Sequence, residues 1–318
     1  MVLTVLLLFL GFALLIKGAD FLVKGASALA RKFNVSELVI GLTIVALGTS
    51  APELVVSVVS STKGLNEVVY GNVIGSNIFN LFLILGVSAV IFPIVVQRST
   101  IKVEIPYSLL AVLLVFFLVN DELIWNGKNY FSRTDALILL VFFSIFMYYI
   151  FKNMKNETPE PSVDNKPKQA MGILILMIIG GLLGLVFGGQ LVVDNAVVIA
   201  RSFSLSDKLI GLTIIAAGTS LPELATSAVA AYRKNSDISI GNVVGSNIFN
   251  LLFVLGISGV ISPMDYNPSL NVDVYVVMAG TVLLFILFLG KTSKLTRWEA
   301  VILLVGYISY VAYLIWRE

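Results

Sequence analysis

Two glutamates lie in the middle of long apolar stretches of the sequence. Glu53 and Glu223 are each flanked on both sides by aliphatic and small residues. A charged side chain at the centre of a bilayer costs about 2.5–3.5 kcal/mol on insertion scales, and such residues usually mark an ion pathway. Pairing with a basic residue would be the structural alternative, but no Lys or Arg lies in the core of another apolar stretch. We therefore expect these glutamates to attract a cation or a proton.

A proline precedes each glutamate, in the pattern Gly-Thr-Ser-x-Pro-Glu. Proline lacks an N–H, and its ring clashes with the carbonyl four residues back, so we expect a helix break at Pro52 and at Pro222. Unsatisfied backbone at membrane depth is tolerated where it lines a cavity. A plain proline kink packed by small residues is the alternative, but its repetition favours an ion site. The carbonyls that the break would free include those of Ala46, Thr49, Ala216 and Thr219.

A second motif, Gly-Asn-Val-x-Gly-Ser-Asn-Ile-Phe-Asn, also occurs twice, at 71–80 and 241–250. Its glycines and serine have the i, i+4 spacing of a close helix–helix contact, which does not require the asparagines. Serine and the last asparagine share one helix face. The candidate ligands of this motif are therefore Ser76, Asn80, Ser246 and Asn250. The other asparagines are interpreted as packing, helix-terminal or interhelical hydrogen-bonding residues: Asn72, Asn242, Asn77 and Asn247.

All these groups are hard oxygen donors, which suit Na⁺, Ca²⁺ or Mg²⁺ rather than Zn²⁺ or Cu⁺. Ca²⁺ accepts about six to eight oxygens in loose geometry, whereas Mg²⁺ demands an octahedron and sheds water reluctantly. Two glutamates neutralise one Ca²⁺, and the same oxygens could be divided among several Na⁺. Competition for shared ligands would couple the two ions directly.

The elements that must position these residues lie in a membrane. Of the 318 residues, 58% are hydrophobic and only 13% are charged, against about 25% charged in soluble domains. The chain has no His and no Cys, which excludes disulfides, thiolate or HExxH metal sites and Ser-His-Asp catalysis. The net charge of +2 is no nucleic-acid signature, and no GxxxxGK[ST] motif indicates ATP-driven pumping.

We predict an all-α integral membrane protein with ten transmembrane helices. A span needs about 20 mostly apolar residues, and several of the stretches are long enough to require tilting or interruption. The spans are predicted near residues 2–30, 36–61, 67–95, 103–119, 134–151, 170–200, 206–231, 237–263, 272–290 and 298–316. The polar linker 152–169 separates a first five-helix repeat, 1–151, from a second, 170–318.

The two halves are related by an internal duplication. Offset by 170 positions, residues 41–80 and 211–250 share 22 identities in 40. Five is an odd number, so the second repeat is expected to be inverted in the membrane, a transporter plan in which helices 2 and 7 are broken. The loops on one side hold 13 Lys and Arg, against six on the other. The positive-inside rule then places linker 152–169 in the cytoplasm and both termini outside.

The motifs GTSAPE with GNVIGSNIFN, repeated as GTSLPE with GNVVGSNIFN, resemble the two α-repeats of the cation/Ca²⁺ exchanger superfamily, most closely those of prokaryotic Na⁺/Ca²⁺ exchangers. The resemblance implies a midplane site between spans 2, 3, 7 and 8, where Glu53 and Glu223 bind Ca²⁺ with the Thr49 and Thr219 carbonyls. It also implies sliding of spans 1 and 6 across the bundle. The implied Na⁺ ligands are Ala46, Thr49, Ser50, Ser246 and Glu223 on one side, and Ala216, Thr219, Ser220, Ser76 and Glu53 on the other.

One position departs from that pattern. Well-known archaeal members have an aspartate where this chain has Asn250, so both Asn80 and Asn250 are amides here. With two ionised carboxylates, one Ca²⁺ leaves the site neutral, and three Na⁺ would leave one positive charge. The number of Na⁺ exchanged and any K⁺ requirement are therefore left open by the sequence.

We expect a secondary antiporter that exchanges Na⁺ for Ca²⁺ in the cell membrane by alternating access, working as a monomer without a cofactor, a nucleic acid or an enzymatic activity. An H⁺/Ca²⁺ antiporter is the nearest alternative, because the glutamates could carry protons. A cation channel is less favoured, since inverted broken helices are more typical of alternating access. An intramembrane enzyme would need an aspartyl pair or a Ser-Lys dyad within the spans, which we do not find.

Overall fold

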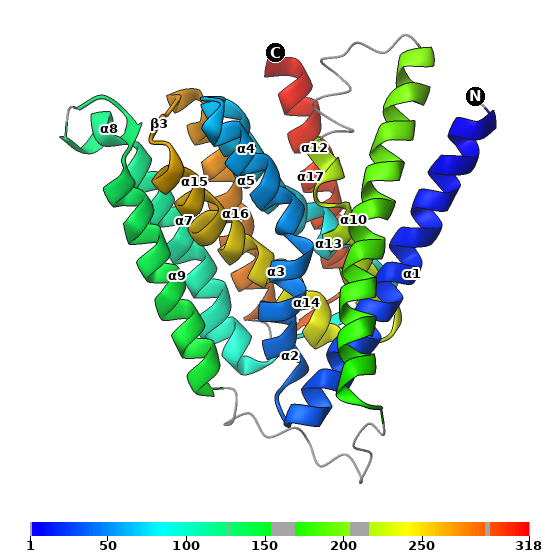
Figure 1. Ribbon diagram of the computed structural model, residues 1–318. Coiled ribbons are helices and arrows are strands. Elements are labelled where there is room, and N and C mark those ends of the chain that lie inside the picture. The colour runs from blue at the N-terminus through cyan, green and yellow to red at the C-terminus, as the bar shows by residue number, and fades with distance from the viewer. Residues whose placement is uncertain (1, 126, 154–168, 204–215, 290–292, 318) are drawn as a thin grey trace.

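The computed structural model describes residues 2–125, 127–153, 169–203, 216–289 and 293–317. This part of the chain is almost entirely helical, and most of the long helices run from one face of the molecule to the other (Figure 1). Within the described residues, eight helices are long and apolar enough to cross a bilayer. Two further helices, Glu37–Thr49 and Ala51–Thr62, meet at a bend of 46° and are together long and apolar enough to count as one broken span. The predicted span 206–231 falls partly on residues 204–215, outside the described residues.

The first half follows the predicted order of spans. Its elements are α1 (Val2–Phe33), α2 (Glu37–Ile40), η1 (Gly41–Val45), α3 (Ala46–Thr49), α4 (Ala51–Thr62), α5 (Asn66–Ile78), η2 (Phe79–Ile84), α6 (Leu85–Ile91), β1 (Ile94–Val95), η3 (Thr100–Glu104), α7 (Ile105–Val119), α8 (Asp121–Trp125), β2 (Tyr130–Phe131) and α9 (Arg133–Asn153).

The described part of the second half repeats this order. Its elements are α10 (Met171–Ser202), α12 (Ala216–Gly218), α13 (Leu221–Tyr232), α14 (Ser236–Ile248), η5 (Phe249–Val254), α15 (Leu255–Ile261), β3 (Met264–Asp265), η6 (Pro268–Leu270), α16 (Asn271–Phe288), β4 (Lys294–Leu295) and α17 (Arg297–Arg317). Both termini lie at one face, called here the termini face (Figure 1). The end of α9 and the start of α10 lie at the opposite linker face.

Four two-residue strands, absent from the all-α prediction, join the halves at each face. β1 pairs antiparallel with β4, with Ile94 opposite Leu295, and β2 pairs with β3, with Tyr130 opposite Asp265. Each pair takes one strand from either half. The charge-based topology places the partners of each pair on the same side of the membrane, which agrees with these contacts.

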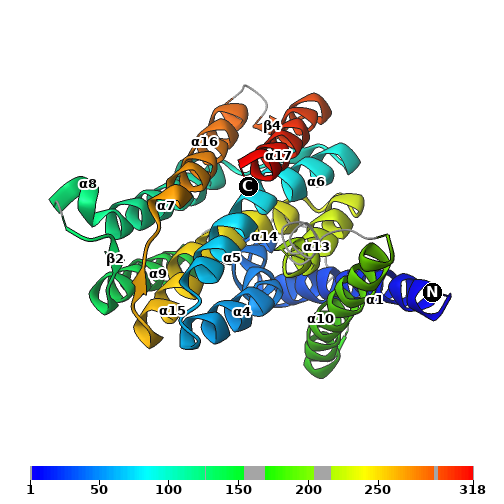
Figure 2. The same ribbon diagram turned by 90° about the horizontal axis from the view of Figure 1, so that it is seen from above.

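The central helices are those that carry the second motif. In the apolar windows of α5–α6 and α14–α15, 72% and 78% of residues are buried, compared with 11% in α17. Seen from above, α5, α13 and α14 lie inside a ring of outer helices (Figure 2). The outer helices expose large apolar side chains, among them Leu3, Phe9, Leu176 and Trp298. This arrangement buries the polar motif and presents apolar faces to lipid.

Helices α1 and α10 pack tightly against each other at one side of the molecule (Figures 1 and 2). A Cβ placed on Gly18 would lie 2.8 Å from the Gly181 carbonyl, and one on Gly188 would lie 2.9 Å from the Gly11 carbonyl. Only glycine allows such an approach without displacing backbone. The first spans of the two repeats, which the resemblance implies to slide across the bundle, thus lie in close contact with each other.

The central helices also contain π-helical turns, which the sequence did not predict. η2 and η5 occupy the same place in the two repeats and contain Asn80 and Asn250. π-Turns are rare and frequently lie at functional sites. Because the π-turn recurs in both repeats, each repeat places one candidate ligand on backbone that departs from a regular α-helix.

Candidate cation site

Each copy of the proline motif interrupts a helix at its serine. Helix α3 ends at Thr49, and α4 begins at Ala51, with Ser50 between them at φ −82° and ψ 6°. Ser220, at φ −90° and ψ 6°, precedes α13 in the same way. The prolines lie in the first turn of the new helix, where a missing N–H leaves no bond unmade. The predicted breaks are therefore present, and the residues that follow the prolines occupy a first turn, where the helix dipole favours negative charge.

The two glutamates are held by serines of the opposite repeat. Ser220 Oγ donates to Glu53 Oε1 at 2.9 Å, and Ser50 Oγ donates to Glu223 Oε1 at 2.9 Å. Ser220 Oγ also lies 3.0 Å from Ser76 Oγ. The two breaks thus face each other, and five of the predicted site residues meet between them.

Two asparagines that the sequence analysis interpreted as packing residues support this site directly. Asn72 Nδ2 donates to the Glu53 carbonyl at 3.1 Å and to Ser57 Oγ at 2.9 Å, while its Oδ1 accepts from the Thr219 hydroxyl at 3.3 Å. The same three contacts recur in the other copy at 3.3, 2.9 and 3.0 Å, from Asn242 to Glu223, Ser227 and Thr49. The equal spacing from glutamate to asparagine in the two copies was the signal that could have identified them.

The predicted ligands lie deep inside the protein. Glu53, Thr49, Ala46, Ser220, Ser246 and Asn80 are fully buried, and Glu223, Asn250, Ser50 and Ser76 are at most 3% exposed. Thr219 is half-buried. Ala216 begins α12, at the edge of the described residues, and only its backbone is described.

Several buried oxygens of this group have no hydrogen-bond partner among the described residues. They are Glu53 Oε2, Glu223 Oε2, Asn80 Oδ1, Asn250 Oδ1 and Ser246 Oγ. Leaving a buried polar atom unpartnered costs about 1–3 kcal/mol. Carboxylate, amide and hydroxyl oxygens are ligands that Na⁺ and Ca²⁺ prefer. The donor set therefore fits a hard cation as cargo.

The π-turns bring the two motif-end asparagines to the opposite repeat. η2, with Asn80, packs against α13 and α14, whereas η5, with Asn250, packs against α4 and α5. Asn80 Nδ2 donates to Asn247 Oδ1 at 3.0 Å. Within the described part of the chain, no three acidic side chains gather in one place, which agrees with a site of two carboxylates.

The carbonyl of Ala46 is already engaged. It accepts from the Ser50 N–H at 3.0 Å and from the Thr49 hydroxyl at 3.3 Å. In the second repeat the Ser220 N–H bonds instead to the Ala217 carbonyl at 3.2 Å. The Thr49 hydroxyl has a single proton and lies closer to Asn242 Oδ1, at 3.0 Å, so one lone pair of the Ala46 carbonyl is available when that proton is donated to Asn242.

A cavity of about 440 Å³ leads along α5 to this site. Successive turns of α5 line it at Val68, Gly71, Asn72 and Gly75, and Thr219 faces it from the second repeat. Its other wall is formed by α16 and α17, whose ends reach the termini face (Figure 1). The cavity therefore extends from one face to Asn72 and Thr219, which border the buried glutamates.

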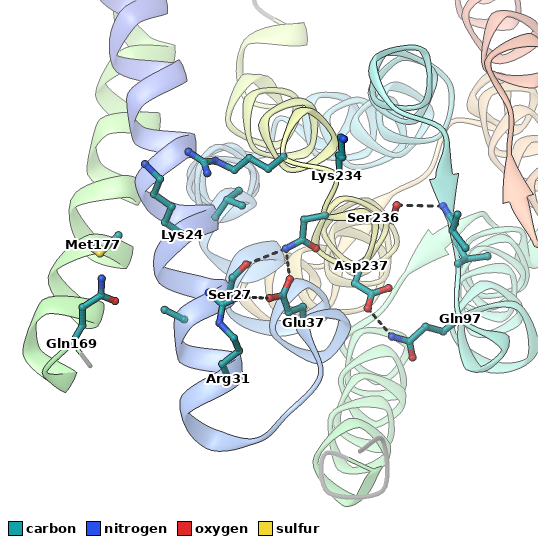
Figure 3. Close-up of a pocket in the computed structure, with 16 residues that line it drawn as sticks. Lys24, Ser27, Arg31, Glu37, Gln97, Gln169, Met177, Lys234, Ser236 and Asp237 are labelled. Atoms are coloured by element: carbon teal, nitrogen blue, oxygen red, sulfur yellow. Dashed lines mark hydrogen bonds and ion pairs between the residues drawn. The ribbon is translucent and has the colours of Figure 1, made fainter. Parts of the chain in front are cut away.

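A larger cavity, of about 750 Å³, contains none of the predicted ligands. It lies between α1, α10 and the start of α14, and charged and amide side chains surround it (Figure 3). There Asn235 Nδ2 contacts Ser27 of α1 and Glu37 of α2. Gln97 Nε2 donates to Asp237 at 2.7 Å. These contacts tie α1 and the β1 segment to the loop before α14.

Known proteins resemble the chain along its whole length. The family profile described as sodium/calcium exchanger protein matches residues 3–152 and 173–316. The putative antiporter CaxA of Alkalimonas amylolytica is 39% identical, with 98% of both chains covered. The sodium/calcium exchanger MaX1 of Methanosarcina acetivorans is 32% identical, with 97% of both chains covered. A solved structure of the sodium-calcium exchanger NCX_Mj, soaked with 10 mM Na⁺, is 36% identical and covers 98% of both chains at a TM-score of 0.82. The chain belongs to the sodium/calcium exchanger family.

Proposed function

We propose that this protein is a secondary antiporter that exchanges Na⁺ for Ca²⁺ across the cell membrane. The observation that carries the proposal is the crossed pairing of two buried glutamates with serines of the opposite repeat, Ser220 with Glu53 and Ser50 with Glu223. A cation between the breaks is bound by both halves at once. The whole-length likeness to exchangers supports the same conclusion.

Ca²⁺ would bind between Glu53 and Glu223, whose free Oε2 atoms supply two anionic ligands. Na⁺ would use the same carboxylates together with hydroxyl and amide oxygens of Ser76, Ser246 and Asn250. A carboxylate that coordinates Ca²⁺ is not available to balance several Na⁺, so occupation by one ion excludes the other. Exchange then follows from competition, without a separate coupling device.

Alternating access is supported by an asymmetry between equivalent residues. Asn72 and Thr219 line the cavity that leads to the termini face, whereas their repeat counterparts, Asn242 and Thr49, are fully buried. A structure in which a cavity approaches the site from one face, while the equivalent residues of the other repeat are buried, is consistent with one state of an exchange cycle.

We further propose the ten-helix plan of two inverted repeats, in which 206–231 provides the tenth span. The termini face is then extracellular, linker 152–169 is cytoplasmic, and the protein acts as a monomer without a cofactor. It moves ions and carries out no enzymatic chemistry. The excess of Lys and Arg in the loops of the linker face supports this orientation.

The test is Ca²⁺ uptake into proteoliposomes loaded with Na⁺ and diluted into Na⁺-free buffer, with ionophores collapsing the pH gradient and the membrane potential. Uptake that requires internal Na⁺ is the expected result. Liposomes loaded with choline provide the control. Uptake that follows an imposed pH gradient and ignores Na⁺ would contradict Na⁺ coupling.

A further inference from the structure

An ion pair lies in the wall of the cavity that leads to the site. Asp273, in the first turn of α16, and Arg317, at the end of α17, both line this cavity. Among the described lining residues, they are the only carboxylate and the only guanidinium or ammonium group. A cation that approaches along this cavity therefore meets these two formal charges before it reaches Asn72 and Thr219.

The pair is built from several contacts. Asp273 is 4% exposed and accepts from the Tyr310 hydroxyl at 3.0 Å. Both terminal nitrogens of Arg317 donate to Asp273 Oδ2 at 3.2 Å. The guanidinium also lies 5.5 Å from the centre of the Tyr313 ring, and its side chain is 30% exposed. The carboxylate is thus buried on the cavity wall, while the guanidinium covers it from the solvent side.

We propose that Asp273 is a docking site for the arriving cation, upstream of the glutamates, and that Arg317 is the resident counter-ion that the cation displaces. A hydrated Na⁺ or Ca²⁺ replaces the guanidinium as the partner of the carboxylate, and Arg317 swings toward solvent. Without the Arg317 guanidinium, the Asp273 carboxylate has no positive partner and attracts cations. Without the Asp273 carboxylate, the Arg317 guanidinium remains as a positive charge that repels them. The two variants therefore have opposite effects on cation arrival.

An analogous arrangement occurs in the first repeat. Glu104 ends η3, directly before α7, is 2% exposed, and accepts from the Tyr149 hydroxyl of α9 at 2.9 Å. Helices α7 and α9 correspond in order to α16 and α17. A buried carboxylate held by a tyrosine of the last helix thus recurs in both repeats.

This inference rests on the proposed exchange, so the test uses Ca²⁺ transport from each face. Right-side-out and everted membrane vesicles present opposite faces to external Ca²⁺, and a C-terminal tag identifies the termini face. The variants are Arg317→Gln and Asp273→Asn. The control pair is Lys128→Gln and Asp265→Asn, because Lys128 Nζ lies 2.7 Å from Asp265 Oδ1 on the same face but outside the cavity.

For Ca²⁺ presented to the termini face at low ionic strength, we expect Arg317→Gln to lower the apparent KM by about three- to tenfold and Asp273→Asn to raise it similarly. The apparent KM from the linker face and that of the control variants should not change. Added choline chloride should shrink the difference, because it screens exposed charges.

An unchanged or raised KM in Arg317→Gln, or an equal effect from both faces, would show that the pair only clamps α16 to α17 and would overturn the proposal. Arg317→Gln is expected to lower the apparent KM for Ca²⁺, whereas partial unfolding would not improve transport. The Arg317→Gln result therefore decides the proposal even when Asp273→Asn folds poorly. Absence of Na⁺-dependent Ca²⁺ transport in the unaltered protein would instead refute the proposed exchange.

Discussion

The second motif is nearly identical in the two repeats, yet its glycines meet different surroundings. A Cβ placed on Gly245 of α14 would lie 2.7 Å from Ala46 Cβ, and one on Gly241 would lie 3.0 Å from the Leu38 carbonyl. At Gly71 and Gly75 of α5, the equivalent Cβ atoms would meet none of the described residues within 4 Å, and residues 208–215, which correspond to most of the segment that covers Gly241 and Gly245, lie outside the described part of the chain. One copy is sealed by the helix half that precedes Glu53, while the other lines the open cavity. Among the described residues, equivalent glycines of the motif therefore take different parts in the two repeats: one pair packs against a neighbouring helix, and the other lines a cavity.

The largest effect is expected from substituting the buried glutamate that each repeat supplies to the site. Glu53→Gln and Glu223→Gln should each reduce Na⁺-dependent Ca²⁺ uptake by at least about a hundredfold, because losing one partner of a buried charge costs about 3–5 kcal/mol. Uptake into proteoliposomes measures the loss, and thermal unfolding in detergent without Ca²⁺ should show no lower midpoint. Glu67→Gln, at an exposed position in the first turn of α5, is the control. Near-normal uptake by either folded variant would remove that glutamate from the site.

Two alanine substitutions test whether equivalent glycines of the two motif copies really differ in how tightly they are packed. Gly245→Ala should destabilise the protein by about 1–3 kcal/mol, because overpacking against Ala46 and the Leu42 backbone forces a displacement. Gly75→Ala adds a methyl group where no described residue lies within 4 Å, and it should leave stability unchanged or raise it slightly. Thermal unfolding of the two purified variants gives the difference directly. Equal destabilisation would mean that both copies are sealed in solution.

Cysteine labelling can measure how much more accessible Thr219 is than its repeat counterpart, Thr49. The chain contains no Cys, so Thr219→Cys and Thr49→Cys each introduce a single thiol at equivalent positions. Thr219 lines the cavity, whereas Thr49 is fully buried. A small charged thiol reagent should label Thr219→Cys at least about tenfold faster, a ratio that requires only about 1.4 kcal/mol in favour of the open state. Equal rates would show that the two states are equally populated.

The smallest expected effect concerns a contact that only one repeat makes. Arg233, at the end of α13, contacts Asp20 of α1, whereas the repeat counterparts of these residues are Lys63 and Gln190. Arg233 is 36% exposed, so Arg233→Gln should lower the free energy of unfolding by only about 0.2–1 kcal/mol. Lys63→Gln should have no effect. Denaturant titration of both variants checks the difference, and a matching loss in Lys63→Gln would exclude a specific role for the Asp20 contact.

Much of the site was predictable because proline and buried charge have strong local consequences. Pro52 and Pro222 fix the helix breaks, and the duplication indicated most of the candidate residues that meet between them. The sequence could not show which serine faces which glutamate, because that pairing depends on how the two halves pack. Asn72 and Asn242 were assigned to packing for the same reason: their partners lie on other helices.

Other features have no signal of their own in the sequence. A two-residue strand is too short for an alternating pattern, so β1 to β4 were missed. The π-turns of η2 and η5 differ from ordinary helix by single hydrogen-bond shifts, which leave the apolar pattern unchanged. Asp273 and Arg317 stand near the ends of predicted spans, where isolated charges are common, and only the fold brings them to one cavity.

The crossed pairing of Ser50 with Glu223 and of Ser220 with Glu53 has a consequence for the origin of the chain. Half of this sequence supplies a glutamate and a serine that do not meet each other, so a half-length ancestor had no complete site within one molecule. Such an ancestor could complete the site only as a homodimer, and on the inverted plan proposed above its two copies were inserted in opposite orientations. Fusing the two copies into one gene would fix that orientation and allow the copies to diverge, as Asp20 and Gln190 have done.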